Sequence, residues 1–134
     1  MEAEDAAPSP DTRKKASQCS EFLASFKYAV GLGNLTPLKP AEYLQNLAEI
    51  GLCPNDAKMI VQGLTPHNYC DGPLGDHYDD ETDVWIFGHR LNNSVEVYIK
   101  LRLKPTKKKN VMQAQIWSFH RAQQPLRYPL RNSR

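Results

Sequence analysis

The segment from residue 95 to residue 104 gives the clearest structural pattern in the sequence, because its residues alternate strictly in character. Odd-numbered positions are aliphatic, whereas even-numbered positions are charged or tyrosine. Successive side chains of a β-strand point to opposite faces, so this pattern predicts a strand with one buried face and one polar face. The buried face would hold Val95, Val97, Ile99, Leu101 and Leu103, and the polar face Glu96, Tyr98, Lys100, Arg102 and Lys104.

Two neighbouring segments, residues 84–89 and 111–120, are also predicted to be strands. The links between the three segments are short, and one contains an Asn pair suited to a hairpin turn, so we expect an antiparallel meander. In the last strand Trp117 and Phe119 share one face and are expected in the core. Ser118 and His120 would then lie beside the Tyr98 face.

The preceding half of the chain predicts three short helices, at residues 21–30, 40–50 and 56–62, with Ser20 as the first N-cap. Residues 1–19 have almost no large apolar side chains and are expected to form a disordered tail. Residues 20–134 would then form a single α+β domain, with helices packed on a small twisted antiparallel sheet and a basic C-terminal tail from residue 121.

The charges are distributed unevenly along the chain. Residues 1–83 contain 6 Lys and Arg against 14 Asp and Glu, whereas residues 84–134 contain 11 against the single acid Glu96. A basic half of this kind favours a polyanionic partner such as nucleic acid. A solvated basic face folded against the acidic half is the alternative.

Several classes of function lack any supporting motif. There is no Walker loop, dinucleotide fingerprint, zinc-hydrolase motif or zinc-finger spacing, and the three cysteines have no CxxC spacing. The acidic loop at residues 76–83 lacks EF-hand spacing. We therefore expect neither a metal nor a cofactor. No run reaches the roughly 18 apolar residues of a membrane span, and the acidic start does not resemble a signal peptide, so a cytoplasmic location without a membrane partner is expected.

The polar strand face carries groups that can cleave RNA. The 2′-hydroxyl of RNA can attack the adjacent phosphorus if a protein supplies a base, an acid and cations for the transition state. Tyr98 and His120 can transfer protons, and Lys100 can stabilise the phosphate charge. A merely solvated strand face is the alternative interpretation.

Five sequence blocks between Gly63 and Pro129 resemble bacterial toxins of the MqsR type, which are RelE-like mRNA interferases. The blocks are Gly63-Leu-Thr-Pro-His-Asn-Tyr-Cys-Asp-Gly-Pro73, Asp83-Val-Trp-Ile-Phe-Gly88, Glu96-Val-Tyr-Ile-Lys-Leu101, Ser118-Phe-His120 and Pro125-Leu-Arg-Tyr-Pro129. The resemblance implies a RelE-like fold, cleavage of mRNA and inhibition by a cognate antitoxin protein. It leaves contact with the ribosome open.

The resemblance also implies roles for individual residues. Tyr98 matches the family's active-site tyrosine, Lys100 the lysine two positions later, and Tyr69 the loop tyrosine. Three positions depart from the best-known pattern. Cys70 replaces a lysine, Ile86 replaces a glutamine thought to act in the reaction, and His120 replaces another lysine.

Tyr98, Lys100 and His120 are therefore the predicted catalytic residues of an endoribonuclease. The predicted RNA-binding residues are Tyr69, Arg102, Lys104, Arg121 and Arg127. Two other classes of protein remain open from the sequence. One is a basic RNA- or DNA-binding module without catalysis, and the other is an interaction protein whose basic strands recruit an acidic partner.

Overall fold

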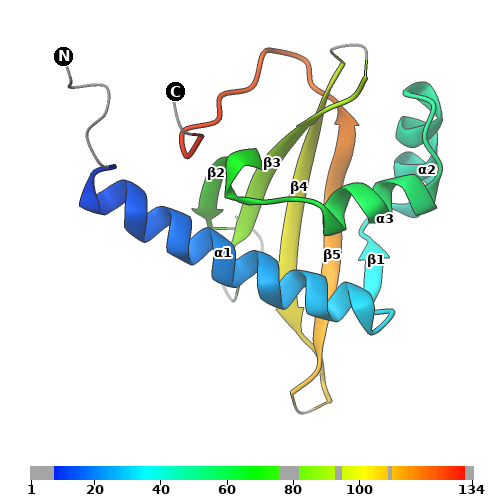
Figure 1. Cartoon of the computed structure of the whole chain (residues 1–134). Coiled ribbons are helices and arrows are strands. Elements are labelled where there is room, and N and C mark those ends of the chain that lie inside the picture. The colour runs from blue at the N-terminus through cyan, green and yellow to red at the C-terminus, as the bar shows by residue number, and fades with distance from the viewer. Residues whose placement is uncertain (1–7, 76–81, 93–94, 109, 132–134) are drawn as a thin grey trace.

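The computed structural model describes residues 8–75, 82–92, 95–108 and 110–131, and these build a five-stranded sheet with helices against one face (Figure 1). The strands are β1 (Leu35–Pro37), β2 (Tyr69–Leu74), β3 (Val84–Arg90), β4 (Glu96–Pro105) and β5 (Met112–Arg121). Their order in the sheet is β1-β5-β4-β3-β2. The α+β class and the meander β3-β4-β5 are thus confirmed. The sheet is mixed, however, because β1 runs parallel to β5.

The central strand β4 has the two faces that its sequence predicts. Val97, Ile99 and Leu101 are fully buried in the core cluster. Tyr98 and Lys100 alternate with them and are half-buried on the opposite, outer face.

A β-bulge in β5 changes the predicted face of Trp117. Lys100 pairs with Ser118, but the next residue, Leu101, pairs with Ile116, so Trp117 is an extra residue in β5. Ile116 and Phe119 both enter the core. The prediction that Trp117 packs there with Phe119 is wrong. Its ring instead contacts Lys100 and Arg102 on the outer face.

The outermost strands, β1 and β2, are not evident in the sequence. β1 has only three residues, and β2 contains Gly72 and Pro73 and pairs with β3 through two register shifts. Proline and irregular pairing are tolerated at a sheet edge, where one side of the strand needs no partner. The sequence of β2 therefore resembles that of a loop.

Helix α1 (Pro10–Gly31) is much longer than predicted. Ser9, rather than Ser20, is the N-cap, and its hydroxyl accepts a hydrogen bond from the backbone N–H of Thr12. The expected disordered tail is thus wrong for residues 10–19, whereas residues 1–7 lie outside the described residues. The extension needs little apolar surface because the helix is anchored further along by Cys19, Leu23, Phe26, Ala29 and Val30, which are all buried.

Helices α2 (Pro40–Glu49) and α3 (Pro54–Gln62) lie where the sequence predicts them. Tyr43 and Leu47 are the buried residues of α2, and Ala57 and Val61 those of α3. Met59 is 64% exposed. The small side chain of Ala57 permits close approach to the core instead.

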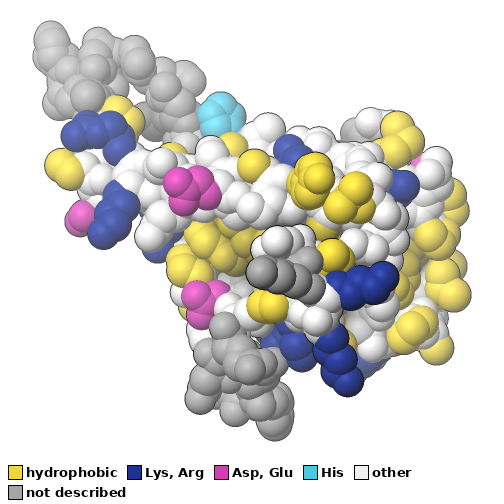
Figure 2. Space-filling view, turned by 90° about the horizontal axis from the view of Figure 1, so that it is seen from below, with side chains coloured by type: hydrophobic (Ala, Val, Ile, Leu, Met, Phe, Trp, Pro, Cys, Tyr) yellow, Lys and Arg dark blue, Asp and Glu magenta, His cyan; other side chains and the backbone are white. Residues whose placement is uncertain are grey.

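Not all large hydrophobic side chains are buried. The most exposed are Tyr28, Leu32, Leu38, Leu44 and Met59, and a view from below shows hydrophobic side chains at the surface beside Lys and Arg (Figure 2). Among the described residues, no helix combines the length and the apolar character needed to cross a bilayer.

The chain after β5 is not a free tail, because residues 122–131 return across the outer face of the sheet (Figure 1). We call these residues the C-terminal segment. Gly88 of β3 pairs with Tyr98, so the two residues share this face. A Cβ atom at Gly88 would lie 2.6 Å from the Tyr128 hydroxyl and 2.7 Å from Leu126 Cδ1. Any larger residue at position 88 would therefore require the side chains of Leu126 and Tyr128 to shift.

Substitution Gly88→Ala should destabilise the fold. The added methyl group would push Leu126 and Tyr128 away, and overpacking of this kind costs about 1–3 kcal/mol. Urea unfolding measures the effect. Gly31→Ala is the matched control, because a Cβ there meets nothing within 4 Å, and it should leave the stability unchanged or slightly raised. Equal stability of Gly88→Ala and the wild type would show that the segment does not pack here.

Candidate functional site

A pocket of about 510 Å³ lies on the outer face between the ends of β4 and β5 and the C-terminal segment. Tyr98 and Lys100 come from β4, and Ser118 and His120 from β5. The remaining wall is formed by four residues of the C-terminal segment, Gln123, Gln124, Pro125 and Leu126. The structure thus brings together all three predicted catalytic residues.

Tyr98 and His120 are direct cross-strand neighbours. Their rings stack with centroids 5.1 Å apart and an interplanar angle of 14°. His120 Nδ1 also lies 2.9 Å from the backbone carbonyl oxygen of Arg121. Because a carbonyl oxygen can only accept a hydrogen bond, this contact requires the hydrogen on Nδ1. Nε2 of the neutral ring then keeps a lone pair that can accept a proton.

The surroundings of the Tyr98 hydroxyl favour its protonated form. Burial raises its pKa above the ordinary tyrosine value, and the negative charge of Asp71 raises it further. The phenol therefore stays protonated near neutral pH. The pocket pairs one group that can accept a proton with another that can donate one.

Lys100 places a cation beside this pair. Its ammonium lies 5.1 Å from the centroid of the Trp117 ring, a contact that holds the flexible side chain against the sheet. Lys100 pairs with Ser118 on one side and with Ile86 on the other. The hydrocarbon side chain of Ile86 supplies no group for proton transfer there.

The predicted RNA-binding residues are less well placed. Tyr69 is 6% exposed, packs edge-on against Trp85 and donates its hydroxyl hydrogen to Gly72. Its ring is therefore covered in this structure, and its RNA-binding role stays a prediction. Arg102 is 4% exposed, donates to Gln115 and lies over Trp117. The side chain of Arg102 therefore lies against the bulged residue, Trp117.

The other three cations lie outside the pocket. Lys104 is half-buried on the outer face, near the far end of β4. Arg127 is exposed on the C-terminal segment. Arg121 pairs with Val97, which is buried on the helix side, and lines a different pocket. That second pocket of about 570 Å³ is larger but contains none of the predicted catalytic residues.

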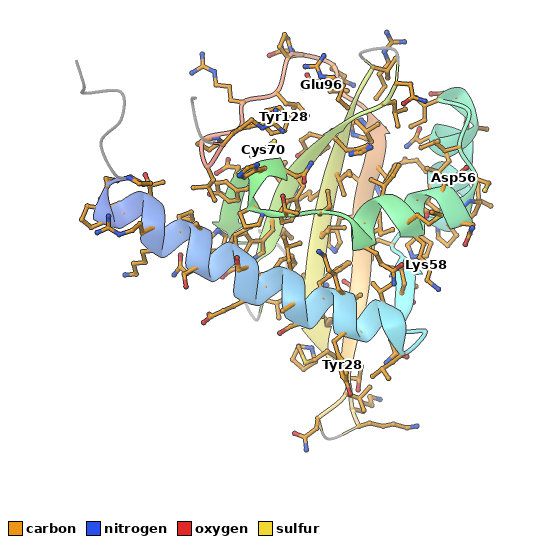
Figure 3. The ribbon with its side chains drawn as sticks, in the orientation of Figure 1. Tyr28, Asp56, Lys58, Cys70, Glu96 and Tyr128 are labelled. Atoms are coloured by element: carbon orange, nitrogen blue, oxygen red, sulfur yellow. The ribbon has the colours of Figure 1, made fainter. Side chains whose placement is uncertain are left out.

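Glu96 fixes the C-terminal segment to the sheet. Its carboxylate accepts hydrogen bonds from the Leu126 backbone N–H at 3.0 Å and from the Tyr128 hydroxyl at 2.8 Å. It also forms an ion pair with Arg90 at 3.5 Å. Figure 3 shows Glu96 and Tyr128 close together at one end of the molecule, with Tyr28 at the other.

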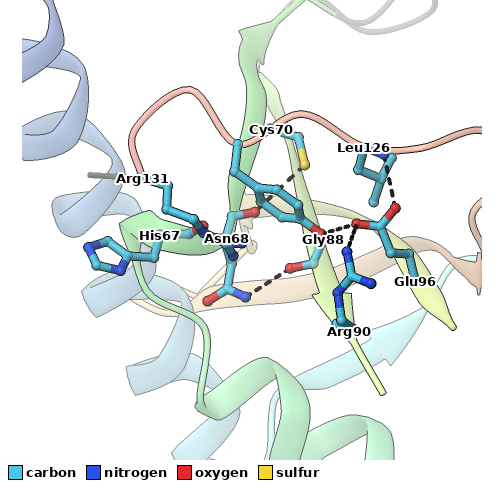
Figure 4. A network of polar contacts seen from close by, with 9 residues as sticks. His67, Asn68, Cys70, Gly88, Arg90, Glu96, Leu126 and Arg131 are labelled. Atoms are coloured by element: carbon cyan, nitrogen blue, oxygen red, sulfur yellow. Dashed lines mark hydrogen bonds and ion pairs between the residues drawn. The ribbon is translucent and has the colours of Figure 1, made fainter. Parts of the chain in front are cut away.

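The network extends beyond the carboxylate (Figure 4). The Arg131 guanidinium stacks 3.9 Å from the centroid of the Tyr128 ring and donates a hydrogen bond to the carbonyl oxygen of His67. Asn68 donates to the carbonyl oxygen of Gly88. The wall of the pocket is therefore attached both to β4 and to the turn that precedes β2.

Cys70 lies in the same region but carries no charge. Burial raises the pKa of its thiol to about 12, and the nearby Glu96 carboxylate adds to this shift. The thiol therefore remains protonated near neutral pH. It cannot replace the positive charge of the lysine that the resemblance places at this position.

Sequence reasoning missed the residues that the C-terminal segment contributes. Glu96 was a usable signal, since it is the one acid in the basic half of the chain. A carboxylate among so many cations is expected to have a specific partner. The partners Leu126 and Tyr128 are 30 and 32 residues away, and nothing in the spacing identifies them.

A metal site finds no support in the described residues, where no three His, Cys, Asp or Glu side chains are grouped to hold an ion. The acidic loop named from the sequence falls largely on residues 76–81, outside the described residues. Comparisons of the chain with protein-family models, curated proteins and solved structures found no match.

Because Glu96 anchors the C-terminal segment, the free energy of unfolding is expected to depend on pH. Burial acts to raise the pKa of Glu96, but hydrogen bonds from Leu126 and Tyr128 and the charges of Arg90 and Arg131 outweigh it, so the pKa is lowered. A carboxyl group with a lowered pKa in the folded state stabilises that state above its unfolded pKa, about 4.3. This stabilisation is lost as the pH falls through the lower, folded value.

The free energy of unfolding of the wild type should therefore exceed that of Glu96→Gln at neutral pH, and the difference should shrink below about pH 4.3. Urea unfolding across a pH series measures it. Glu21→Gln, which changes an exposed carboxylate on α1, is expected to follow the wild-type curve. A difference between wild type and Glu96→Gln that does not vary with pH would contradict the anchoring role.

Proposed function

We propose that this chain is an endoribonuclease toxin of the MqsR type with a RelE-like fold, and that it cleaves mRNA without a metal. The observation that carries the proposal is the pocket in which Tyr98, Lys100 and His120 meet. These residues were selected from the sequence alone. The shared α+β class and the sequence blocks between Gly63 and Pro129 support the same family.

The geometry supports a division of labour among the three residues. His120 Nε2 removes the proton from the 2′-hydroxyl of the substrate, whose oxygen then attacks the adjacent phosphorus. The bond to the 5′-oxygen breaks, and the leaving oxygen takes a proton from the Tyr98 hydroxyl. Lys100 offsets the negative charge that grows on the non-bridging oxygens. The products are a 2′,3′-cyclic phosphate and a free 5′-hydroxyl.

A basic nucleic-acid-binding module without catalysis is the second candidate. Two residues favour it, Ile86 and Cys70. They stand where the MqsR-type toxins have polar residues, and they supply neither a proton-transfer group nor a charge. RNA would then bind to Lys100 and the outer face without being cut. Under the first candidate, the proposed partners are mRNA and a cognate antitoxin, together with the ribosome where cutting occurs during translation. Under the second candidate, the partner is RNA or DNA.

The test is cleavage of a long single-stranded RNA by the purified protein in excess EDTA. The wild type should cut the RNA, and His120→Ala should cut it about 10²–10⁴-fold more slowly, the usual contribution of a general acid or base. RNA affinity of the variant, measured by fluorescence anisotropy, should stay near the wild-type value because Lys100 is retained.

His67→Ala is the matched control, since that side chain is exposed on the turn before β2. It should retain wild-type activity. RNA binding without cleavage by the wild type would favour the second candidate. Cleavage that EDTA abolishes and magnesium restores would contradict the proposed mechanism.

A further inference from the structure

The pocket has two walls of different chemical character. The floor on β4 and β5 offers a cation, a phenol, an imidazole and the Ser118 hydroxyl. These groups suit phosphate and ribose, which are the same in every nucleotide and carry no sequence information. The opposite wall, on the C-terminal segment, instead presents the two adjacent amides of Gln123 and Gln124.

Amide side chains are suited to reading bases. Each one has two N–H donors and a carbonyl acceptor, so it can pair with the edge of a base that presents both kinds of group. Single-stranded RNA is recognised mainly through such contacts to unstacked bases. Gln123 and Gln124 are exposed. Neither side chain forms a hydrogen bond within the part of the chain that the structure describes.

The backbone next to these glutamines is anchored to the sheet. Leu126, two residues after Gln124, is bound through its backbone N–H to Glu96. Tyr128 is bound to the same carboxylate and lies against Gly88. Specific recognition requires polar groups that are held in place before the ligand arrives. The contacts with Glu96 hold the backbone that carries the two amides, which a free tail would not provide.

We propose that Gln123 and Gln124 are specificity-determining residues that select the base next to the cleaved phosphate, and that Glu96 acts as a positioning residue by holding their segment over the pocket. This inference rests on the proposed ribonuclease function. It assigns the choice of cleavage site to the C-terminal segment and the chemistry to the strands.

The test compares cleavage sites on a long single-stranded RNA. The double variant Gln123→Ala/Gln124→Ala should still cut, but the ratio of cutting at preferred sites to cutting elsewhere should fall by about 10-fold or more. That is the discrimination expected from one bidentate contact between an amide and a base. Gln62→Ala, which removes an exposed amide from α3, is the matched control and should preserve the wild-type site pattern.

Variants of Glu96 test the positioning role separately. Glu96→Ala should relax the site pattern as the double variant does, and combining the two changes should add little, because both act on the same wall. Glu96→Gln keeps an oxygen that can accept from the Leu126 N–H, so it should restore most of the preference. Loss of preference in Glu96→Gln equal to that in Glu96→Ala would overturn the positioning role.

The outcomes separate this inference from the proposed function. Cleavage by the double variant at the wild-type sites with unchanged relative frequencies would overturn the inference and leave the ribonuclease intact. A uniform loss of cutting at all sites would also overturn it. If the wild type cuts no RNA, the proposed function fails and this inference with it.

Thermal unfolding confirms that each variant is folded. Should the double variant not fold, the single variants Gln123→Ala and Gln124→Ala decide in the same way.

Discussion

The pairing of β4 with β5 is the interaction on which both the core and the pocket depend. A shift of one residue would turn every side chain of a strand to the other face, so this register keeps Val97, Ile99 and Leu101 buried while Tyr98 meets His120. The bulge at Trp117 restores the inward direction of Ile116. It also moves the indole outward, where its ring can hold Lys100.

The pocket also depends on the carboxylate of Glu96. This carboxylate holds the C-terminal segment, which has no regular secondary structure, in place as one wall of the pocket. Two hydrogen bonds and an ion pair converge on a side chain that is only 12% exposed. Hydrogen bonds to a charged group are stronger than those between neutral groups. The site is thus assembled from a rigid strand pair and from a segment held by one residue of the same strand.

Much of the fold could be predicted because buried side chains leave regular patterns in the sequence. Apolar residues alternate in a strand with one buried face, and they recur on one side of a packed helix. That is why β4 and the positions of α2 and α3 were correct. The errors have identifiable causes. Helix α1 extends through polar residues because Ser9 caps it and its buried residues lie further along the helix. In β5, the bulge at Trp117 interrupts the alternation of buried and exposed residues. The burial of Tyr69 beside Trp85 could not be seen in the sequence either, because the two residues are 16 positions apart. The three catalytic candidates could be chosen from residue chemistry, whereas Gln123 and Gln124 depend on a contact with Glu96 that no local pattern reveals.

If the proposed reaction uses the substrate's own 2′-hydroxyl, the nucleotide at the cut bond must be a ribonucleotide. The most direct measurement uses an RNA oligonucleotide that contains a single 2′-deoxyribose at the cleaved position, alongside the all-ribose sequence. We expect the all-ribose strand to yield a 2′,3′-cyclic phosphate and a 5′-hydroxyl end, and the substituted strand to bind but resist cleavage at that bond. Cleavage of the substituted strand at the same bond, or fragments with 5′-phosphate ends, would contradict the account.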